Sequence, residues 1–471
     1  LSNMVSPPKP QTPDANWGFE EMITWATESY LPFQAWCSTQ EQFDSDLFQI
    51  GDVFSEWLIR NWDDLHANSK RMVFNVFPNI ATELNRPDTV NLVLVVDNLA
   101  WSFGEALIEM FQEEGYFQTQ VLPYLAMLPT ETETSKKCLL SGEVGYTEID
   151  DRSYKGIIEK GWLPYFNEQT FQYVSGIGKL KEIKQIEATT YVVNYLAVDR
   201  ALHKSEDEIG ISHRKHIQHL LKELVGLVID FIENHHLKSS IRIHVVSDHG
   251  STQIPSNFQN DLEPANFKSS GFKSRSHRYL EVSDERFTTL ADNLSFDAFL
   301  LDKNRFLLPK HILASRRANR FLKTDHKSYV HGGLLPEEVI VPYLAFEPVT
   351  VPLQDLTVLM AKNIFRYRLE TVEIEIGNPN EFLVENIQVS ILNGNVESDP
   401  VMIPSLNGKS KTLVSVETRF KITSLPDDQK NLRLRLRYHS RGERHMLDIS
   451  SGITMKKMVE EKSTSVFDDL E

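Results

Sequence analysis

Four short, continuous apolar segments constrain the fold of this chain more than any other feature. They are NLVLVVD (91–97), YLAML (124–128), TTYVVNYLAVD (189–199) and SSIRIHVVSDHG (239–250). Stretches with apolar residues at helical spacing lie between them, as in residues 102–115 and 213–236. Continuous apolar runs are typical of parallel strands that are buried on both faces. Their alternation with helices predicts an α/β fold with a doubly wound, mostly parallel sheet.

Three of these apolar segments reach a carboxylate at their carboxyl end. The residues are Asp97, Asp199 and Asp248. Ligands of open α/β sheets bind beyond the carboxyl ends of the strands. We therefore expect these carboxylates, which are far apart in sequence, to converge on one edge of the sheet.

The patterns on either side divide the chain into further parts. Residues 1–15 are polar and Pro-rich and are expected to form a disordered leader, and residues 16–89 repeat apolar positions at helical spacing. Residues 90–346 contain the alternating strands and helices. Residues 347–458 alternate apolar and polar positions, with turn residues about every ten, which predicts an Ig-like antiparallel β-sandwich. Residues 459–471 form a charged tail.

Composition limits the partners and the metal chemistry. The two cysteines, Cys37 and Cys138, exclude a disulfide framework and a thiolate-rich metal site, and they suit a reducing cytoplasm. A net charge of −17 argues against binding to nucleic acid or anionic membranes over the whole surface. No run reaches the roughly 18 apolar residues of a membrane-spanning helix. Residues 267–330, however, form a basic insertion with 13 Lys and Arg against 7 Asp and Glu.

Several polar residues could bind metal, although each has a simpler explanation when taken alone. Asp199 and His203 lie one helical turn apart, a spacing that surface helices also show by chance. Asp248 and His249 end a buried strand, and His331 precedes two glycines, where a turn histidine is common. Asp97 could be the N-cap of the following helix. Their order along the chain is more informative than any single residue.

That order resembles the alkaline phosphatase superfamily, and within it the PglZ family. The superfamily pattern is a strand-terminal Asp, a Ser or Thr nucleophile, an Asp-x3-His, an Asp-His and a final His. The segments that resemble PglZ proteins are LPTETETSKKCLLSG, VVSDHGST and HGGLLPEEVIVP. In the first segment the family nucleophile corresponds to Thr132, whereas Thr130 and Thr134 are neighbours that the sequence does not exclude. The resemblance covers about residues 90–345.

The resemblance implies a site for two divalent cations, Zn²⁺ in preference and Mn²⁺ tolerated. One cation is expected beside Thr132 and the other facing the leaving oxygen. The implied ligands of the first are Asp97, Asp248 and His249, and those of the second are Asp199, His203 and His331. The basic insertion, with Arg316 and Arg317 as candidates, could attract a phosphodiester or a nucleotide. Alternatively, its cations pair with the acidic surface.

The resemblance therefore implies a metal-dependent phosphodiesterase or phosphatase with a threonine nucleophile. A nucleotide-type substrate, a role in bacterial phage defence of the BREX type, partner proteins from that defence system and a cytoplasmic location are also implied. The alternative is a structural subunit whose metal site mainly supports folding, while the β-sandwich and the N-terminal helices dock partners. A sulfatase is disfavoured, because such enzymes need a modified Cys or Ser where this chain has Thr132.

Overall fold

The computed structural model divides into two compact units, residues 1–114 with 121–348 and residues 115–120 with 349–471. Both cysteines are buried. Within the described residues, no helix combines the length and the apolarity that a bilayer crossing requires. The described residues are 6–40, 45–86, 89–144, 153–162, 170–204, 209–237, 240–254, 260–262, 272–274, 276–292, 297–321, 328–348, 353–366, 369–380, 382–394, 396–421, 431–440 and 443–456.

A six-stranded sheet forms the centre of the first unit, in the order β2-β14-β5-β1-β4-β3. β3, β4, β1 and β5 run parallel to one another, whereas β14 runs antiparallel to β5. The prediction of a mostly parallel α/β sheet is thereby confirmed. The strands are β1 (Val90–Val96), β2 (Tyr116–Leu125), β3 (Phe171–Val174), β4 (Thr190–Tyr195), β5 (Ile241–Ser247) and β14 (Ile340–Pro348).

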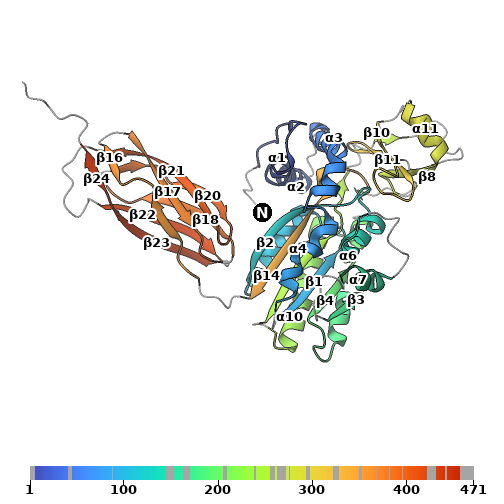
Figure 1. Ribbon diagram of the computed structural model, residues 1–471, viewed down its shortest axis with the longest axis horizontal. Helices are drawn as coiled ribbons and strands as arrows, with labels where there is room; N and C mark the ends of the chain where they lie inside the picture. Colours follow the sequence, from blue (N-terminus) through green and yellow to red (C-terminus); the bar gives the residue numbers. More distant parts are fainter. Residues whose placement is uncertain are drawn as a thin grey trace, which may run out of the picture. The chain divides into compact units, whose positions relative to one another are not determined.

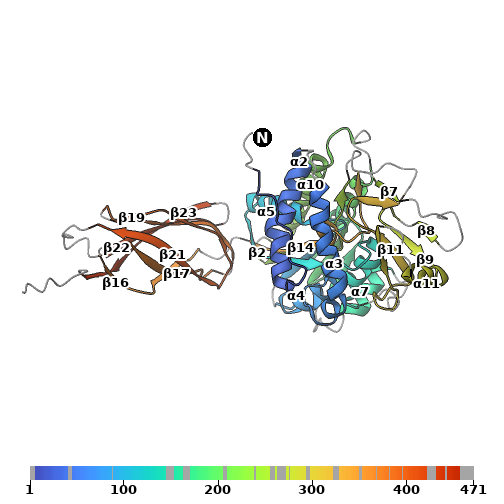
Figure 2. The ribbon, with the colours of Figure 1, turned by 90° about the horizontal axis from the view of Figure 1, so that it is seen from above.

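Helices cover both faces of this sheet, which explains why β1 is apolar along its length. In Figures 1 and 2, α4, α6 and α7 lie on one face and α5 and α10 on the other. β1 is buried from Asn91 to Val96. The covering helices are α4 (Val76–Leu84), α5 (Gly104–Glu113), α6 (Lys137–Ser141), α7 (Tyr154–Trp162) and α10 (His213–Asn234).

The N-terminal segment is helical, as its periodicity predicts. It contains α1 (Phe19–Trp25), η1 (Ala26–Tyr30), α2 (Leu31–Gln40) and α3 (Ser45–Asn68). The expected disorder of the leader does not extend to residues 6–15. Pro10 and Pro13 are buried, and Trp25 Nε1 donates a hydrogen bond to the carbonyl oxygen of Gln11 (2.9 Å). The apolar proline rings and the tryptophan donor hold the segment against the helices, although its composition is typical of disorder. Residues 1–5 lie outside the described part.

The described part of the basic insertion forms a small antiparallel sheet, in the order β10-β11-β9-β8, with α11 beside it (Figure 1). These elements are β8 (Phe272–Ser274), β9 (Tyr279–Val282), α11 (Asp284–Asp292), β10 (Ala298–Leu301) and β11 (His311–Ser315). The remaining elements of the first unit are short. They are η2 (Val73–Asn75), η3 (Trp101–Phe103), η4 (Thr132–Lys136), η7 (Ile177–Glu182), α8 (Ala197–Leu202), β6 (Thr252–Gln253), β7 (Asn260–Leu262), β12 (Asn319–Phe321), β13 (Tyr329–Val330) and α12 (Pro336–Val339).

The second unit consists mainly of two four-stranded antiparallel sheets that share one apolar core, as in a β-sandwich. The sheet orders are β15-β17-β21-β19 and β20-β18-β22-β23, and β16 pairs with β24. Along β22, alternate residues are buried, which matches the period-two pattern of the sequence. The expected tail, 459–471, lies outside the described residues. The strands are β15 (Thr357–Met360), β16 (Ile364–Arg366), β17 (Leu369–Gly377), β18 (Val384–Ile391), β19 (Val396–Ser398), β20 (Val401–Leu406), β21 (Lys411–Phe420), β22 (Asn431–Ser440), β23 (Glu443–Gly452) and β24 (Thr454–Lys456).

Candidate active site and metal centre

Three neighbouring parallel strands bring the carboxylates together. β1 lies between β5 and β4, and its end is followed directly by Asp97. Asp248 follows β5, and Asp199 lies in the first turn of α8, directly after β4. Because parallel strands end at the same edge, the three side chains meet above the middle of the sheet.

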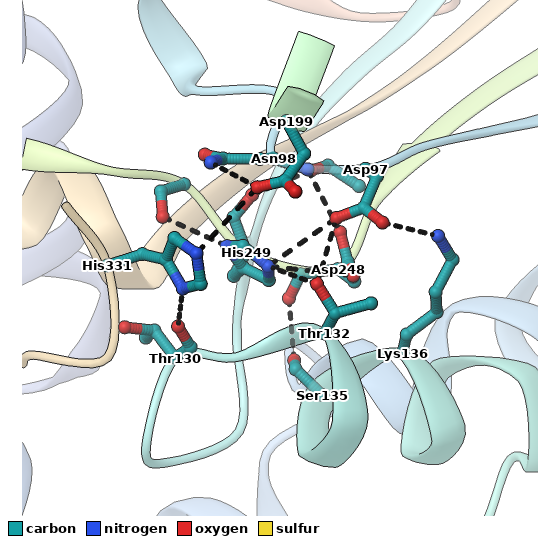
Figure 3. Close-up of polar contacts among 12 residues, drawn as sticks. Asp97, Asn98, Thr130, Thr132, Ser135, Lys136, Asp199, Asp248, His249 and His331 are labelled. Atoms are coloured by element: carbon teal, nitrogen blue, oxygen red, sulfur yellow. Dashed lines mark hydrogen bonds and ion pairs between the residues drawn. The ribbon is translucent and has the colours of Figure 1, made fainter. Parts of the chain in front are cut away.

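Asp97, Asp248 and His249 form one candidate metal site (Figure 3). One ligand atom from each lies within 4.8 Å of the others. His249 Nε2 is 3.5 Å from Asp97 Oδ1 and 3.8 Å from Asp248 Oδ2. His249 Nδ1 lies 3.1 Å from the carbonyl oxygen of Gly250, so it donates its proton there and leaves Nε2 as the free ligand atom.

A second group of ligand atoms lies beside the first and shares His249. Asp199, His249 and His331 also offer atoms within 4.8 Å of one another. His203 Nε2 is 3.3 Å from both Asp199 Oδ2 and His331 Nε2. His331 Nδ1 lies 3.2 Å from the carbonyl oxygen of Thr130, which again directs Nε2 towards the other ligands (Figure 3). All six expected metal ligands therefore lie in one cluster.

The Thr132 hydroxyl points into this cluster from the start of η4. Its Oγ1 is 3.1 Å from Asp97 Oδ1 and 3.0 Å from His249 Nε2. The Thr130 hydroxyl has a different environment, because it accepts a hydrogen bond from Gly332 N (3.0 Å) and donates one to the Gly333 carbonyl (2.9 Å). Of the neighbouring threonines, Thr132 is thus the one whose hydroxyl contacts the ligands.

The charges of the cluster are strongly coupled. Burial and the neighbouring Asp248 raise the pKa of Asp97 to about 6, although Lys136 and His249 oppose the shift. Burial alone would also raise the pKa of Asp199, but the hydrogen bond from His203 and the nearby histidines lower it overall. Burial and the neighbouring His249 lower the pKa of His331 to about 3. Burial would lower the pKa of His249, but the neighbouring Asp248 and Asp97 raise it overall. Carboxylates that repel one another beside imidazole nitrogens are a typical environment for a bound cation.

The residues present fit a divalent cation. Asp248 Oδ2 is completely buried and has no hydrogen-bond partner among the described residues. A buried carboxylate oxygen without a partner is costly, and a metal ion would satisfy it. The donor set consists of imidazole nitrogens and carboxylate oxygens. Such mixed ligands suit Zn²⁺ and tolerate Mn²⁺.

Sequence reasoning missed two polar residues of the cluster. The first is Asn98, whose backbone N–H donates to Asp248 Oδ1 (3.2 Å) and whose side chain donates to Asp199 Oδ1 (3.0 Å). Its φ of 60° is left-handed, a conformation that Asn tolerates better than most residues. The second is Lys136, whose ammonium donates to Asp97 Oδ2 (2.9 Å). Spacing was the available signal, since Asn98 follows Asp97 directly and Lys136 lies four residues after Thr132.

A buried ion pair holds the loop that carries His331. Both carboxylate oxygens of Glu338 accept hydrogen bonds from Arg278, and the same oxygens accept the N–H groups of Gly333 and Leu335. Both charged side chains are completely buried. Arg278 belongs to the basic insertion, and the nearby Ser276 hydroxyl donates a hydrogen bond to the His331 carbonyl oxygen (3.2 Å), so part of that insertion supports the loop of an expected ligand.

Arg316 and Arg317, the candidates for substrate binding, are engaged elsewhere. The Arg316 guanidinium binds Asp52 (2.6 Å) and Glu56 on α3, and Arg317 lies 3.0 Å from Asp297. Neither residue lines the pocket beside the metal ligands. The expectation that they bind substrate stays a prediction. In the structure their guanidinium groups contact the carboxylates of Asp52, Glu56 and Asp297.

An open pocket of about 680 Å³ lies next to the cluster. Its walls include Thr132, Tyr154, Tyr173 and the exposed sides of Asp199 and His203. A volume of this size accommodates a ligand as large as a nucleotide.

The sequence of residues 77–346 matches the model of the BREX system PglZ alkaline phosphatase-like domain. This chain belongs to the PglZ family. The matched residues include all six expected ligands and Thr132. The PglZ domain has an alkaline phosphatase-like fold, as the family description states. No curated protein matches the chain significantly.

Among solved structures, this chain is similar to ectonucleotide pyrophosphatase/phosphodiesterase 5. An inactive murine form in complex with AMP is 11% identical, with a TM-score of 0.39, and the match covers 55% of this chain and 87% of that chain. A second murine structure, whose name mentions neither inactivity nor AMP, is 12% identical, with a TM-score of 0.40, and the match covers 55% of this chain and 88% of that chain. The human enzyme is 12% identical, with a TM-score of 0.39 over 55% and 87%.

Proposed function

We propose that the PglZ domain is a two-metal phosphoester hydrolase, a phosphodiesterase or phosphatase, with Thr132 as its nucleophile. The observation that carries the proposal is the position of Thr132 Oγ1, 3.1 Å from Asp97 Oδ1 and 3.0 Å from His249 Nε2. These two residues belong to a cluster of Asp and His ligand atoms. A hydroxyl among such ligands is suited to activation as a nucleophile.

Asp97, Asp248 and His249 would hold one cation, and Asp199, His203 and His331 the other. Two divalent cations in such a site lower the pKa of a nucleophilic hydroxyl and stabilise charge on the phosphoryl group and the leaving oxygen. The orphaned Asp248 Oδ2 and the mixed donor set favour zinc, with manganese tolerated.

In this reaction, Thr132 Oγ1 forms a bond to phosphorus while the bond to the leaving ester oxygen breaks. The Thr132 hydroxyl loses its proton, the leaving alkoxide takes one up, and the phosphoryl group stays on Thr132 Oγ1, as phosphothreonine from a monoester or as a threonyl phosphodiester from a diester. Water then hydrolyses this threonyl ester and restores the hydroxyl. His249 and His331 direct their Nε2 atoms into the cluster, because backbone carbonyl oxygens accept the protons of their Nδ1 atoms.

A nucleotide-type substrate suits the pocket beside Thr132. Its volume of about 680 Å³ is in the range of small-molecule sites. Tyr154 and Tyr173 line it, and their rings offer surfaces on which a base can stack. We further propose a role in BREX-type phage defence, which the BREX system named in the family description supports, with other defence proteins as partners and the cytoplasm as the location.

The decisive experiment is a hydrolysis assay on metal-depleted protein reloaded with Zn²⁺ or Mn²⁺. Bis-p-nitrophenyl phosphate, p-nitrophenyl phosphate and a nucleoside p-nitrophenyl phosphate serve as substrates. We expect activity that depends on metal and is highest on a diester with a nucleoside. Thr132→Ala is expected to lower kcat by about a thousandfold or more, because the nucleophile is lost. Thr134→Ala, on the same helical turn, is the matched control and is expected to retain activity.

Full activity in the Thr132→Ala variant would rule out this nucleophile. Metal that binds stoichiometrically and raises Tm without hydrolysis of any substrate would instead favour the structural subunit. In that case the metal site supports folding, and the β-sandwich of the second unit, which has its own apolar core, docks partners.

A further inference from the structure

Lys136 is a buried cation inside the candidate active site. Its side chain is 0% exposed, and its ammonium lies 2.9 Å from Asp97 Oδ2, on a carboxylate that is itself 3% exposed. Lysine is almost never fully buried unless it is paired, because transfer of an ammonium out of water is costly. The chain therefore places a lysine ammonium group beside an expected metal ligand (Figure 3).

The two oxygens of Asp97 have different partners. Oδ2 accepts the hydrogen bond from Lys136, whereas Oδ1 faces Thr132 Oγ1 (3.1 Å) and His249 Nε2 (3.5 Å). A carboxylate with both oxygens free can bind a cation through either or both. With Oδ2 occupied, only Oδ1 is directed towards the ligand atom of His249.

Lys136 is also linked to the nucleophile and to the pocket. Thr132 and Lys136 are the first and last residues of η4, so one helical turn carries two of the side chains that contact Asp97. The Lys136 ammonium lies 5.7 Å from the centre of the Tyr154 ring, and Tyr154 lines the pocket. A displacement of the ammonium would therefore affect Asp97, Thr132 and the pocket wall together.

We propose that Lys136 is a positioning residue for phosphoryl transfer. Its ammonium group occupies Asp97 Oδ2, so that Asp97 binds metal through Oδ1 alone. The position of Oδ1 in turn fixes the Thr132 hydroxyl for attack. This inference rests on the proposed hydrolase function. Simple charge balance for the buried carboxylates is the competing explanation. The two differ in their effects on turnover and on metal binding.

The test compares Lys136→Met and Lys136→Arg by steady-state kinetics and by titration of metal-depleted protein with zinc. We expect Lys136→Met to lower kcat by about 10- to 100-fold, the size of effect seen for residues that orient metal ligands, with KM changed less than about threefold. Its zinc affinity should equal or exceed that of the unchanged protein, because the variant lacks the positive charge next to Asp97 that repels the zinc ion. Lys136→Arg keeps the charge and should restore most of kcat.

Lys411→Met is the matched control. Lys411 also forms an ion pair of 2.9 Å, with Glu375, but its side chain is 63% exposed and lies in the second unit. We expect neither kcat nor zinc affinity to change. If Lys136→Met does not fold, Lys136→Gln tests the inference instead: it keeps a donor for Asp97 without the charge, so kcat should be largely retained, and a loss of kcat as large as that expected for Lys136→Met would support charge balance and overturn the inference.

Two further results would overturn the inference. One is an unchanged kcat in Lys136→Met. The other is a zinc affinity that falls together with the thermal stability of the metal-loaded protein, which a purely structural ion pair predicts. If even the unchanged protein hydrolyses no ester, the proposed function fails. The zinc titration then still decides whether Lys136 restricts Asp97 to one ligand oxygen.

Discussion

At the scale of single residues, the molecule concentrates buried ionisable groups near one edge of the sheet. Glu337 is an example outside the expected ligands. Its Oε1 accepts a hydrogen bond from Thr252 (2.7 Å), whereas its buried Oε2 has no such partner among the described residues. Burial raises the pKa of Glu337 to about 7, the Thr252 hydrogen bond opposes this shift, and Glu338 adds to it. Such a group couples folding to proton uptake.

Glu337→Gln should therefore change the pH dependence of stability. The folded protein binds the Glu337 proton more tightly than the unfolded chain does, so stability falls as pH rises from about 4.5 to about 7 and then levels off. We expect the variant to be more stable than the unchanged protein by about 3 kcal/mol at pH 8 and by less than about 1 kcal/mol at pH 5. Urea unfolding at both pH values measures the difference. A stability gap that is the same at both would contradict the assignment.

At the scale of elements, the loop between β13 and α12 gives His331 its position. Gly332 has a φ of 103°, which is strained for any other residue, and a Cβ there would contact the Tyr279 ring at 2.6 Å. A Cβ on Gly333 would overlap the Glu338 carboxylate and the Arg278 guanidinium. The two glycines after His331 therefore allow the backbone to approach the buried ion pair closely.

Removal of charge from this ion pair should be costly. Glu338→Gln leaves the Arg278 guanidinium buried without its counter-charge, and we expect a loss of about 3 kcal/mol of stability. Glu375→Gln is the matched control, since its partner Lys411 is exposed, and its effect should stay below about 0.5 kcal/mol. Guanidinium chloride unfolding compares the two variants. Equal losses would show that burial does not determine the strength of the Arg278–Glu338 pair.

At the scale of the whole molecule, the metal ligands and the β-sandwich belong to different units. All six expected ligands lie in the first unit, whereas the second unit has an apolar core of its own. Units with separate cores can unfold in separate transitions.

We therefore expect calorimetry to show two transitions, of which zinc raises only one, because a ligand stabilises the unit that binds it. Leu434→Ala, in the core of the second unit, should lower the stability of that unit by about 3 kcal/mol. It should lower the temperature only of the transition that zinc does not shift. The zinc-dependent shift should be the same in the variant and in the unchanged protein. A single transition that responds to both changes would mean that the units unfold together.

Local signals in the sequence were sufficient for the central strands β1, β4 and β5 and for most of the candidate site. Continuous apolar runs predicted buried parallel strands, and the polar residues at their ends, Asp97, Asp199 and Asp248, lie at one edge because neighbouring parallel strands end together. The order of motifs predicted His203, His249 and His331, which the structure brings into the same cluster.

Other contacts depended on packing between segments that are distant in sequence. Composition gave Lys136, Arg278 and Arg316 the same positive charge, and no local pattern distinguishes their roles. The register and packing of the folded chain direct the first to Asp97, the second to Glu338 and the third to Asp52. The sequence alone determined which groups could bind metal, because ligand chemistry is a property of residue type. Only the tertiary structure decided which Lys or Arg side chain faces which carboxylate, because that depends on distances set by the packing of the whole first unit.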